Sequence, residues 1–226
     1  MAKKQTAILR RQPRQARGER RITELLDAAD RVFAAVGYEA ATTNAIAKEA
    51  GASVGSLYQF FPDKEALLLA LAERYLGELR AIHERVFTAD TARLPLAEMY
   101  DLVVETLHAF SRSHPGFRPL FYGSPTTAPA LAAAAATLHR ECVDRVDLMM
   151  SHGMPHIAPA RRRLLANLNV TAVKALLPLA ETGNPRCRED VLAEIKRMLH
   201  AHMQAVLADE AAEIGHAGDR AEISRR

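Results

Sequence analysis

The stretch that decides the fold is GASVGSLYQFFPDKEALL, residues 51–68. Gly51 is followed by Ser53, whose hydroxyl can cap the first turn of a helix, and Pro62 with Asp63 marks the start of the next helix. Residues 54–60 are therefore predicted to form a separate helix of about two turns. A helix this short adds little to a core, which raises the question of what it contacts.

Two helices are predicted before this stretch. From residue 17 to residue 37 the apolar positions recur at steps of three and four, and Gly37 stands where a left-handed C-terminal cap belongs. The segment TTNAIAKEAG, residues 42–51, then predicts a short helix. Either Thr42 or Thr43 can cap its first turn, and the glycine that opens the quoted stretch ends it.

The rest of the chain is also predicted to be helical. A long helix is predicted over residues 63–87, and a helix-poor break at residues 87–95 separates it from the C-terminal helices. These further helices are predicted at residues 96–113, 129–150, 159–180 and 188–213. Because no convincing run of alternating polar and apolar residues predicts a strand, the expected fold class is all-α.

Positive charge is concentrated at the N-terminal end. Residues 1–22 hold eight Lys or Arg and one Glu, a net charge of +7, whereas the whole chain carries +3. Such an arm is typical of a protein that binds a polyanion, although a solvated disordered tail has the same composition. No apolar run is long enough to span a membrane, and no apolar leader follows the basic start, so we expect a cytoplasmic protein.

Two short helices joined by a turn at Gly51 are the arrangement expected if the second helix enters a DNA major groove. The groove admits one helix, and the preceding helix braces that helix from behind. The positions expected to face the partner are Ser53, Gly55, Ser56 and Gln59. Glutamine can bind adenine through two hydrogen bonds, but an ordinary helical hairpin has the same spacing.

Residues 20–68 carry many residues at fixed offsets that together resemble the N-terminal block of TetR-type transcriptional regulators. They are Phe33, Gly37, Tyr38, Thr42, Thr43, Ile46, Ala47, Ala50, Gly51, Ser53, Gly55, Leu57, Tyr58, Phe61, Lys64, Glu65 and Leu67. The resemblance implies a three-helix DNA-binding domain followed by helices that form a ligand pocket and a dimer interface. Phe60 departs from the family pattern, because many members carry His there and phenylalanine cannot donate to a phosphate.

The predicted architecture is a helix-turn-helix DNA-binding domain joined by a long helix to a larger helical ligand-binding and dimerisation domain. The predicted parts are a basic flexible arm (1–16), the DNA-binding domain (17–64), the ligand-binding and dimerisation domain (65–214, with helix 63–87 as the connection) and a flexible tail (215–226). The residue chemistry and the resemblance together predict DNA contacts at Thr42, Thr43, Ser53, Val54, Gly55, Ser56, Tyr58, Gln59 and Lys64.

Two further sets of residues are predicted to bind a ligand and a second subunit. The aromatic and apolar side chains expected to line a pocket, with polar partners, are Met99, Tyr100, Leu107, Phe110, His114, Phe117, Arg118, Phe121, Tyr122 and Met149. The apolar stripes expected at a dimer interface contain Leu168, Val173, Leu176, Val191, Ile195, Met198 and Met203. Both sets are also compatible with an ordinary core inside one subunit.

The predicted function is a ligand-responsive transcriptional regulator, a repressor that binds a palindromic DNA operator as a homodimer and is released by a partly apolar small molecule. The alternative is a helical protein-binding adaptor. No enzyme, cofactor or metal is expected. Residues 51–55 match the G-x-S-x-G pattern of a nucleophile elbow, but that elbow needs a preceding strand, which the helical segment before Gly51 does not supply.

Overall fold

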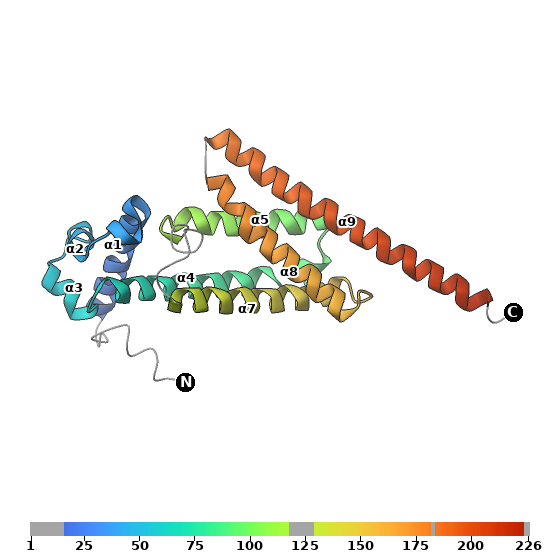
Figure 1. The fold of residues 1–226 in the computed structure, drawn as a ribbon, viewed down its shortest axis with the longest axis horizontal. Coiled ribbons are helices and arrows are strands. Elements are labelled where there is room, and N and C mark those ends of the chain that lie inside the picture. The colour runs from blue at the N-terminus through green and yellow to red at the C-terminus, as the bar shows by residue number, and fades with distance from the viewer. Residues whose placement is uncertain (1–15, 118–128, 182–183, 224–226) are drawn as a thin grey trace. The chain divides into compact units, whose positions relative to one another are not determined.

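The structure is a computed structural model that describes residues 16–117, 129–181 and 184–223, drawn in colour in Figure 1. In these ranges every regular element is a helix, so the all-α prediction is confirmed. The α-helices are α1 (Ala16–Ala40), α2 (Thr43–Glu49), α3 (Val54–Phe60), α4 (Lys64–Val86), α5 (Leu96–Ser113), α7 (Pro129–Gly153), α8 (Pro159–Leu176) and α9 (Pro185–Ile223). Two short 3₁₀ helices, η2 (Thr91–Arg93) and η3 (Leu177–Glu181), lie between them.

The chain divides into two compact units. Unit 1 consists of Met1–Ile82 together with Ala109–Arg140, and unit 2 consists of His83–His108 together with Glu141–Arg226. Helices α4, α5 and α7 contribute residues to both units. The segment after His108 therefore groups with the N-terminal helices, although the sequence placed it with the C-terminal ones.

The core of unit 1 joins the three N-terminal helices to α4. Its fully buried side chains include Leu25 and Phe33 from α1, Ile46 from α2 and Leu57 from α3. Helix α4 contributes Leu67, Leu68, Leu71 and Tyr75, which recur at helical spacing along one face. Each helix thus buries one stripe against the others, which is the expected source of stability for short helices.

Both glycines that were predicted to end helices have a positive φ, but the left-handed cap predicted at Gly37 is wrong, because its ψ is 166° and α1 continues to Ala40. Gly37 has φ +75° and interrupts the helical geometry of α1, and Gly51 has φ +59° in the turn between α2 and α3. Residues with a side chain rarely adopt a positive φ, because the β-carbon then approaches a backbone oxygen. These two turns are therefore set by local sequence.

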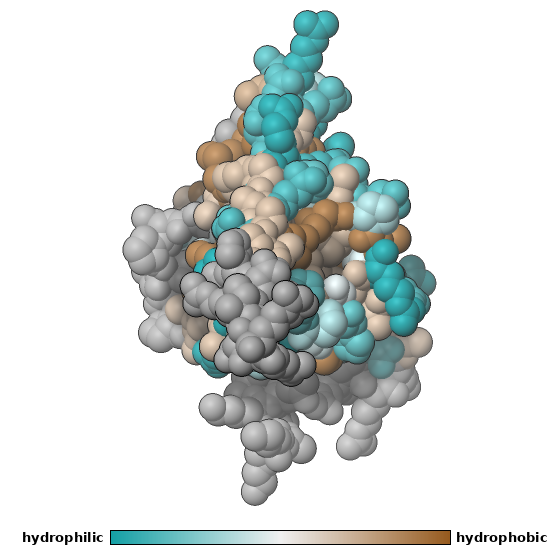
Figure 2. Space-filling view, turned by 90° about the vertical axis from the view of Figure 1, so that its right-hand side faces the viewer, coloured by the Kyte–Doolittle hydropathy of each residue, from teal (hydrophilic) through white to brown (hydrophobic). Residues whose placement is uncertain are grey.

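The core of unit 2 combines side chains from α5, α7, α8 and α9. Its buried members are Met99, Tyr100, Val104, Cys142, Val143, Val146, Met149, Met150, Ile157, Leu165, Ala166, Val173, Leu177, Ala180, Leu192, Ile195, Leu199, Met203 and Val206. Other apolar side chains of unit 2 remain exposed, among them Leu148, Leu164 and Met198. Figure 2 shows such brown apolar surface mixed with teal hydrophilic surface on the face it views.

The C-terminal helices differ from the predicted boundaries. Helix α8 ends at Leu176 and passes into the 3₁₀ helix that contains Pro178, whose missing N–H favours the change. Helix α9 starts three residues earlier than predicted, because the side-chain oxygen of Asn184 accepts a hydrogen bond of 2.9 Å from the Cys187 amide. It also continues to Ile223, so residues 215–223, predicted as a flexible tail, lie on a helix rich in alanine and glutamate.

Replacing Gly51 with alanine is expected to lower the free energy of unfolding by about 1–2 kcal/mol, because the residue must keep a positive φ. Gly55→Ala is the control, since Gly55 lies inside α3 with no positive φ and its new β-carbon would meet only Ser53 Oγ at 3.9 Å. Urea denaturation followed by circular dichroism compares the two. Equal midpoints for both variants would contradict the role assigned to the Gly51 turn.

Candidate DNA-binding site

Hydrogen bonds within the backbone and from two caps define the α2–turn–α3 segment. Thr42 Oγ1 accepts from the Ala45 amide at 3.1 Å, so Thr42 rather than Thr43 caps α2. Ser53 Oγ accepts from the Ser56 amide at 3.1 Å and caps α3 as predicted. Both hydroxyl groups accept in these bonds, so each keeps its proton to donate to a partner.

One side of α3 is buried and the other faces solvent. Leu57 is fully buried and anchors the helix, while Tyr58 has 39% of its surface exposed. The predicted contacts that are exposed are Thr42, Ser53, Gly55, Tyr58 and Gln59, and those that are half-buried are Thr43, Val54, Ser56 and Lys64. The predicted set thus lies along α3 and at the starts of α2, α3 and α4, and Thr43 and Tyr58 of this set are in direct contact.

Two hydroxyl groups from different helices meet on this surface. Thr43 Oγ1 of α2 and Tyr58 Oη of α3 lie 3.1 Å apart, and either atom can be the donor. The hydroxyl that accepts retains its own proton for an external acceptor. A phosphate oxygen is such an acceptor, and hydroxyl groups of Thr and Tyr are common phosphate contacts in DNA complexes.

The Lys64 ammonium group already has partners within the protein. Its Nζ donates to the carbonyl oxygens of Tyr38 at 2.7 Å and Glu39 at 3.1 Å. It also lies 4.4 Å from the centroid of the Tyr38 ring, which is a cation–π contact. Sequence reasoning predicted only a phosphate contact for Lys64, because its carbonyl partners are 26 and 25 residues away along the chain.

Part of the basic N-terminal arm lies outside the described residues, which begin at Ala16. On α1, Arg17 and Arg20 are exposed, whereas Arg21 is paired with Glu24 at 2.8 Å. Arg31 of α1 is paired with Glu49 of α2 at 2.6 Å. These surface pairs add little stability in water, so the two exposed arginines at the start of α1 are the charges most accessible to a polyanion.

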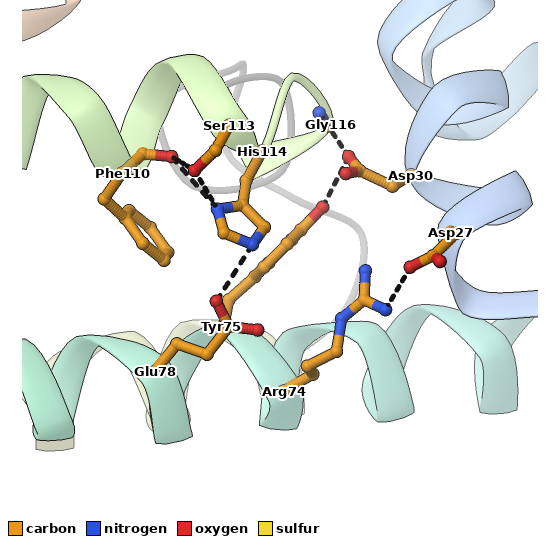
Figure 3. Close-up of polar contacts among 9 residues, drawn as sticks. All are labelled: Asp27, Asp30, Arg74, Tyr75, Glu78, Phe110, Ser113, His114 and Gly116. Atoms are coloured by element: carbon orange, nitrogen blue, oxygen red, sulfur yellow. Dashed lines mark hydrogen bonds and ion pairs between the residues drawn. The ribbon is translucent and has the colours of Figure 1, made fainter. Parts of the chain in front are cut away.

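A buried carboxylate ties α1 to α4 and to the segment after α5 (Figure 3). Asp30 Oδ1, on α1, accepts hydrogen bonds from Tyr75 Oη of α4 at 2.6 Å and from the Gly116 amide at 2.5 Å. Burial, and then the hydrogen bond to Asp30, raises the pKa of Tyr75, so the phenol stays protonated as a donor. Asp27 of the same helix is paired with Arg74 at 2.6 Å.

Three residues predicted to bind a ligand lie beside Tyr75 in unit 1. The rings of Phe110, His114 and Phe117 have centroids 6.4, 5.2 and 5.5 Å from that of Tyr75. His114 Nε2 lies 2.9 Å from Glu78 Oε2, and its Nδ1 lies 3.0 Å from both the Phe110 carbonyl oxygen and Ser113 Oγ. Figure 3 shows His114 pointing from the end of α5 toward α4.

The other predicted ligand residues lie elsewhere. Met99, Tyr100 and Met149 are buried in the core of unit 2, and Leu107 packs against that core. Tyr100 donates to Asn169 Oδ1 at 2.7 Å, and burial raises its pKa. Arg118, Phe121 and Tyr122 fall outside the described residues.

The residues predicted at a dimer interface separate into two groups. Val173, Ile195 and Met203 are buried within the core of unit 2, and Leu176 and Val191 are half-buried against it. Leu168 and Met198 each expose 46% of their surface, and the neighbouring Leu164 exposes 47%. The exposed members are the ones available to a second subunit.

The features that suggested enzyme chemistry have structural roles. Ser53 in the G-x-S-x-G pattern is the N-cap of α3 and follows a helix, so it is not on a nucleophile elbow. Among the described residues, no group of three His, Cys, Asp or Glu side chains is placed to hold a metal ion.

The chain matches two protein families, each over a different range of residues. "Bacterial regulatory proteins, tetR family" matches residues 25–71, and "Tetracyclin repressor-like, C-terminal domain" matches residues 95–203. The second match extends the similarity well beyond the N-terminal block that the sequence motifs identified. Together the two matches cover both the helix-turn-helix and most of the helices after it.

Curated relatives and solved structures agree with these matches. The chain is 33% identical over 61% of its length to the transcriptional activator FasR of Mycolicibacterium smegmatis, and 30% identical over 64% to the transcriptional repressor KstR of Mycobacterium tuberculosis. The matches span 61% and 63% of the length of those two relatives. A TetR-family regulator from Streptomyces coelicolor aligns in structure with a TM-score of 0.55 and 28% identity, over 82% of this chain and 99% of that one.

Replacing Gly116 with alanine is expected to destabilise unit 1 by about 1–3 kcal/mol, because overpacking forces neighbouring groups apart. The new β-carbon would clash with Asp30 Oδ1 and lie 2.8 Å from the Asp30 carbonyl oxygen. The control is Gly77→Ala on α4, where a new β-carbon would have no neighbour within 4 Å. This substitution should raise the free energy of unfolding by about 0.5–1 kcal/mol. Thermal unfolding measures both, and a neutral Gly116→Ala would refute the close approach.

Proposed function

The chain belongs to the TetR family of bacterial regulatory proteins, and we propose on this basis that it represses transcription by binding a palindromic operator as a homodimer, from which a small molecule releases it. The matched family and the two relatives FasR and KstR are transcriptional regulators and not enzymes. One named relative is an activator and another is a repressor, so the direction of control is part of the proposal.

The observation that carries the proposal is the exposed face of α3. This helix is seven residues long, is capped at its start and buries only Leu57. A helix held in this way by one anchor presents its first turns outward, which is the geometry needed to enter a major groove. An adaptor that binds proteins gains nothing from a small, polar helix face of this kind, which makes the adaptor alternative the weaker one.

The contacts with DNA are proposed to divide into phosphate and base contacts. The hydroxyl pair of Thr43 and Tyr58 is proposed to donate one hydrogen bond to a phosphate, since whichever hydroxyl accepts from the other keeps its own proton free. Gln59 is exposed and can reach a base edge, where an amide binds adenine through two hydrogen bonds. Ser53, Ser56 and Gly55 allow the backbone of α3 to approach closely.

Dimerisation is proposed to use exposed apolar side chains of α8 and α9. Leu164 and Leu168 lie four residues apart on α8, and Met198 lies on α9. Residues at this spacing share one helix face, so they can pack against the same surface of a second subunit. A two-fold dimer would present two α3 helices to a palindromic site.

Ligand release is proposed to act through the aromatic side chains around Tyr75. Phe110, His114 and Phe117 pack on Tyr75, and Tyr75 in turn donates to Asp30 of the first DNA-binding helix. A partly apolar ligand that moves these rings would change the support of α1. A tenfold loss of operator affinity needs only about 1.4 kcal/mol of differential binding between the two states.

We propose a cytoplasmic location. One stretch of the described residues, Pro159–Glu181, is long and apolar enough by composition to cross a membrane. Leu165, Ala166 and Val173 of this stretch are buried in the core of unit 2, which is typical of a core helix in a soluble protein.

DNA binding is tested by selecting duplexes from a random pool with the purified protein and measuring their retention in a gel shift. Recovery of a sequence with two related half-sites is expected. Tyr58→Phe should then weaken binding to the selected duplex about tenfold, because one charge-assisted hydrogen bond is lost. Binding without sequence preference would reject the operator proposal.

A double-mutant cycle sharpens this test. The losses of DNA-binding free energy caused by Thr43→Val and Tyr58→Phe should be less than additive in the double variant, because the two hydroxyls are proposed to serve one phosphate. Thr23→Val is the matched control, since the Thr23 hydroxyl donates to the Glu19 carbonyl on α1 and should not affect DNA affinity.

Replacing Leu168 with glutamate is expected to shift the protein from dimer to monomer at micromolar concentration, because it places a charge within the proposed apolar contact. The control is Leu102→Glu on α5, which changes a leucine of similar exposure (40%) outside that contact. Sedimentation velocity reports the oligomer. A wild-type protein that is monomeric under these conditions would rule out the dimer.

A further inference from the structure

We infer that Lys64 is a positioning residue for DNA binding, which holds the turn between α1 and α2 in place and does not itself contact a phosphate. The inference rests on the proposed function for its effect on DNA, but its structural part can be measured on the protein alone. The contacts of the Lys64 ammonium group support this inference.

The first argument is the set of groups that Lys64 Nζ contacts. It donates to the carbonyl oxygens of Tyr38 at 2.7 Å and Glu39 at 3.1 Å, and it lies over the Tyr38 ring. An ammonium group has three N–H donors, so two are used and the ring covers another side. Half-buried as it is, Lys64 has little freedom to turn toward an external phosphate.

The second argument concerns helix dipoles. Lys64 is the first residue of α4, where a positive charge opposes the positive end of the helix dipole. Its ammonium group instead binds the carbonyl oxygens of Tyr38 and Glu39, which follow Gly37, where the helical geometry of α1 is interrupted. The two hydrogen bonds to carbonyl oxygens offset the unfavourable position on α4, which is expected of a group that connects two elements.

The third argument is the negative charge around this site. Burial raises the pKa of Tyr38, whose ring centroid lies 4.4 Å from Lys64 Nζ, and the negative charges of Glu65, Glu39 and Asp63 raise it further. Asp63 also caps α4, since its Oδ1 accepts from the Ala66 amide at 2.8 Å. The negative charge that acts on Tyr38 also disfavours the approach of a phosphate to this part of the surface.

The backbone that Lys64 holds leads directly into the DNA-binding helices. Tyr38 and Glu39 lie between Gly37 and the cap residue Thr42, and the Ala41 amide donates to the Gly37 carbonyl oxygen at 3.2 Å. Fixing this short segment to α4 sets the direction in which α2 starts. Since α3 is joined to α2 by the Gly51 turn, Lys64 acts on α3 from a distance.

The experiment combines hydrogen exchange on the DNA-free, full-length protein with binding to the duplex selected by the wild-type protein. In Lys64→Gln the Ala41 amide should exchange about tenfold faster, because a hydrogen bond to a charged group is lost from the turn. The Ala50 amide, which donates to the Ile46 carbonyl oxygen at 2.9 Å within α2, should be unchanged and excludes global unfolding.

DNA binding separates positioning from direct contact. Lys64→Gln should weaken binding while the slope of log affinity against log salt stays the same, whereas loss of a phosphate contact lowers that slope by about 0.9. Lys64→Arg should restore both exchange and affinity, because a guanidinium group can donate to the same carbonyls and stack on the Tyr38 ring. Lys48→Gln, which removes an exposed charge from α2, controls for the change in net charge.

Faster Ala41 exchange together with an unchanged salt slope and rescue by arginine supports the inference. Unchanged Ala41 exchange overturns it, and so does a salt slope that falls by about 0.9, which would identify a direct phosphate contact. If the wild-type protein selects no duplex, the proposed function fails, and the exchange measurement still decides whether Lys64 holds the turn.

Discussion

A buried carboxylate must find hydrogen-bond donors, and the arrangement of unit 1 depends on the donors that Asp30 finds. Tyr75 supplies one from α4 and the Gly116 amide supplies another from the segment after α5. Losing either donor would leave a charge or an acceptor unsatisfied in the interior. The first helix is therefore held by two parts of the chain that are remote in sequence, and both must stay in place.

The surface proposed to bind DNA is built on this support by shorter-range interactions. Leu57 anchors α3 in the core, Ser53 caps it, and Gly51 sets its direction. Lys64 connects the turn after α1 to the start of α4. Each of these residues limits the freedom of α3 before DNA is present, and such pre-organisation reduces the entropy lost on binding.

Local features were predictable from the sequence because their causes lie within a few residues. The positive φ of Gly51, the Ser53 cap and the bounds of α3 and α5 follow from local conformational preferences and agree with the prediction. The start of α9 was misplaced because the capping role of Asn184 was not recognised. Gly116 carried no local signal at all, since the groups that would crowd a β-carbon there belong to Asp30 and Tyr75, which are remote in sequence.

By itself the sequence determined the helical class and the short bracketed helix, because periodicity, caps and glycines act over one or two turns. The tertiary structure alone decided which polar groups meet. Asp30 and Gly116 are 86 residues apart, and Lys64 and Tyr38 are 26 residues apart. Contacts at such separations depend on how whole helices pack, and no local preference specifies that packing.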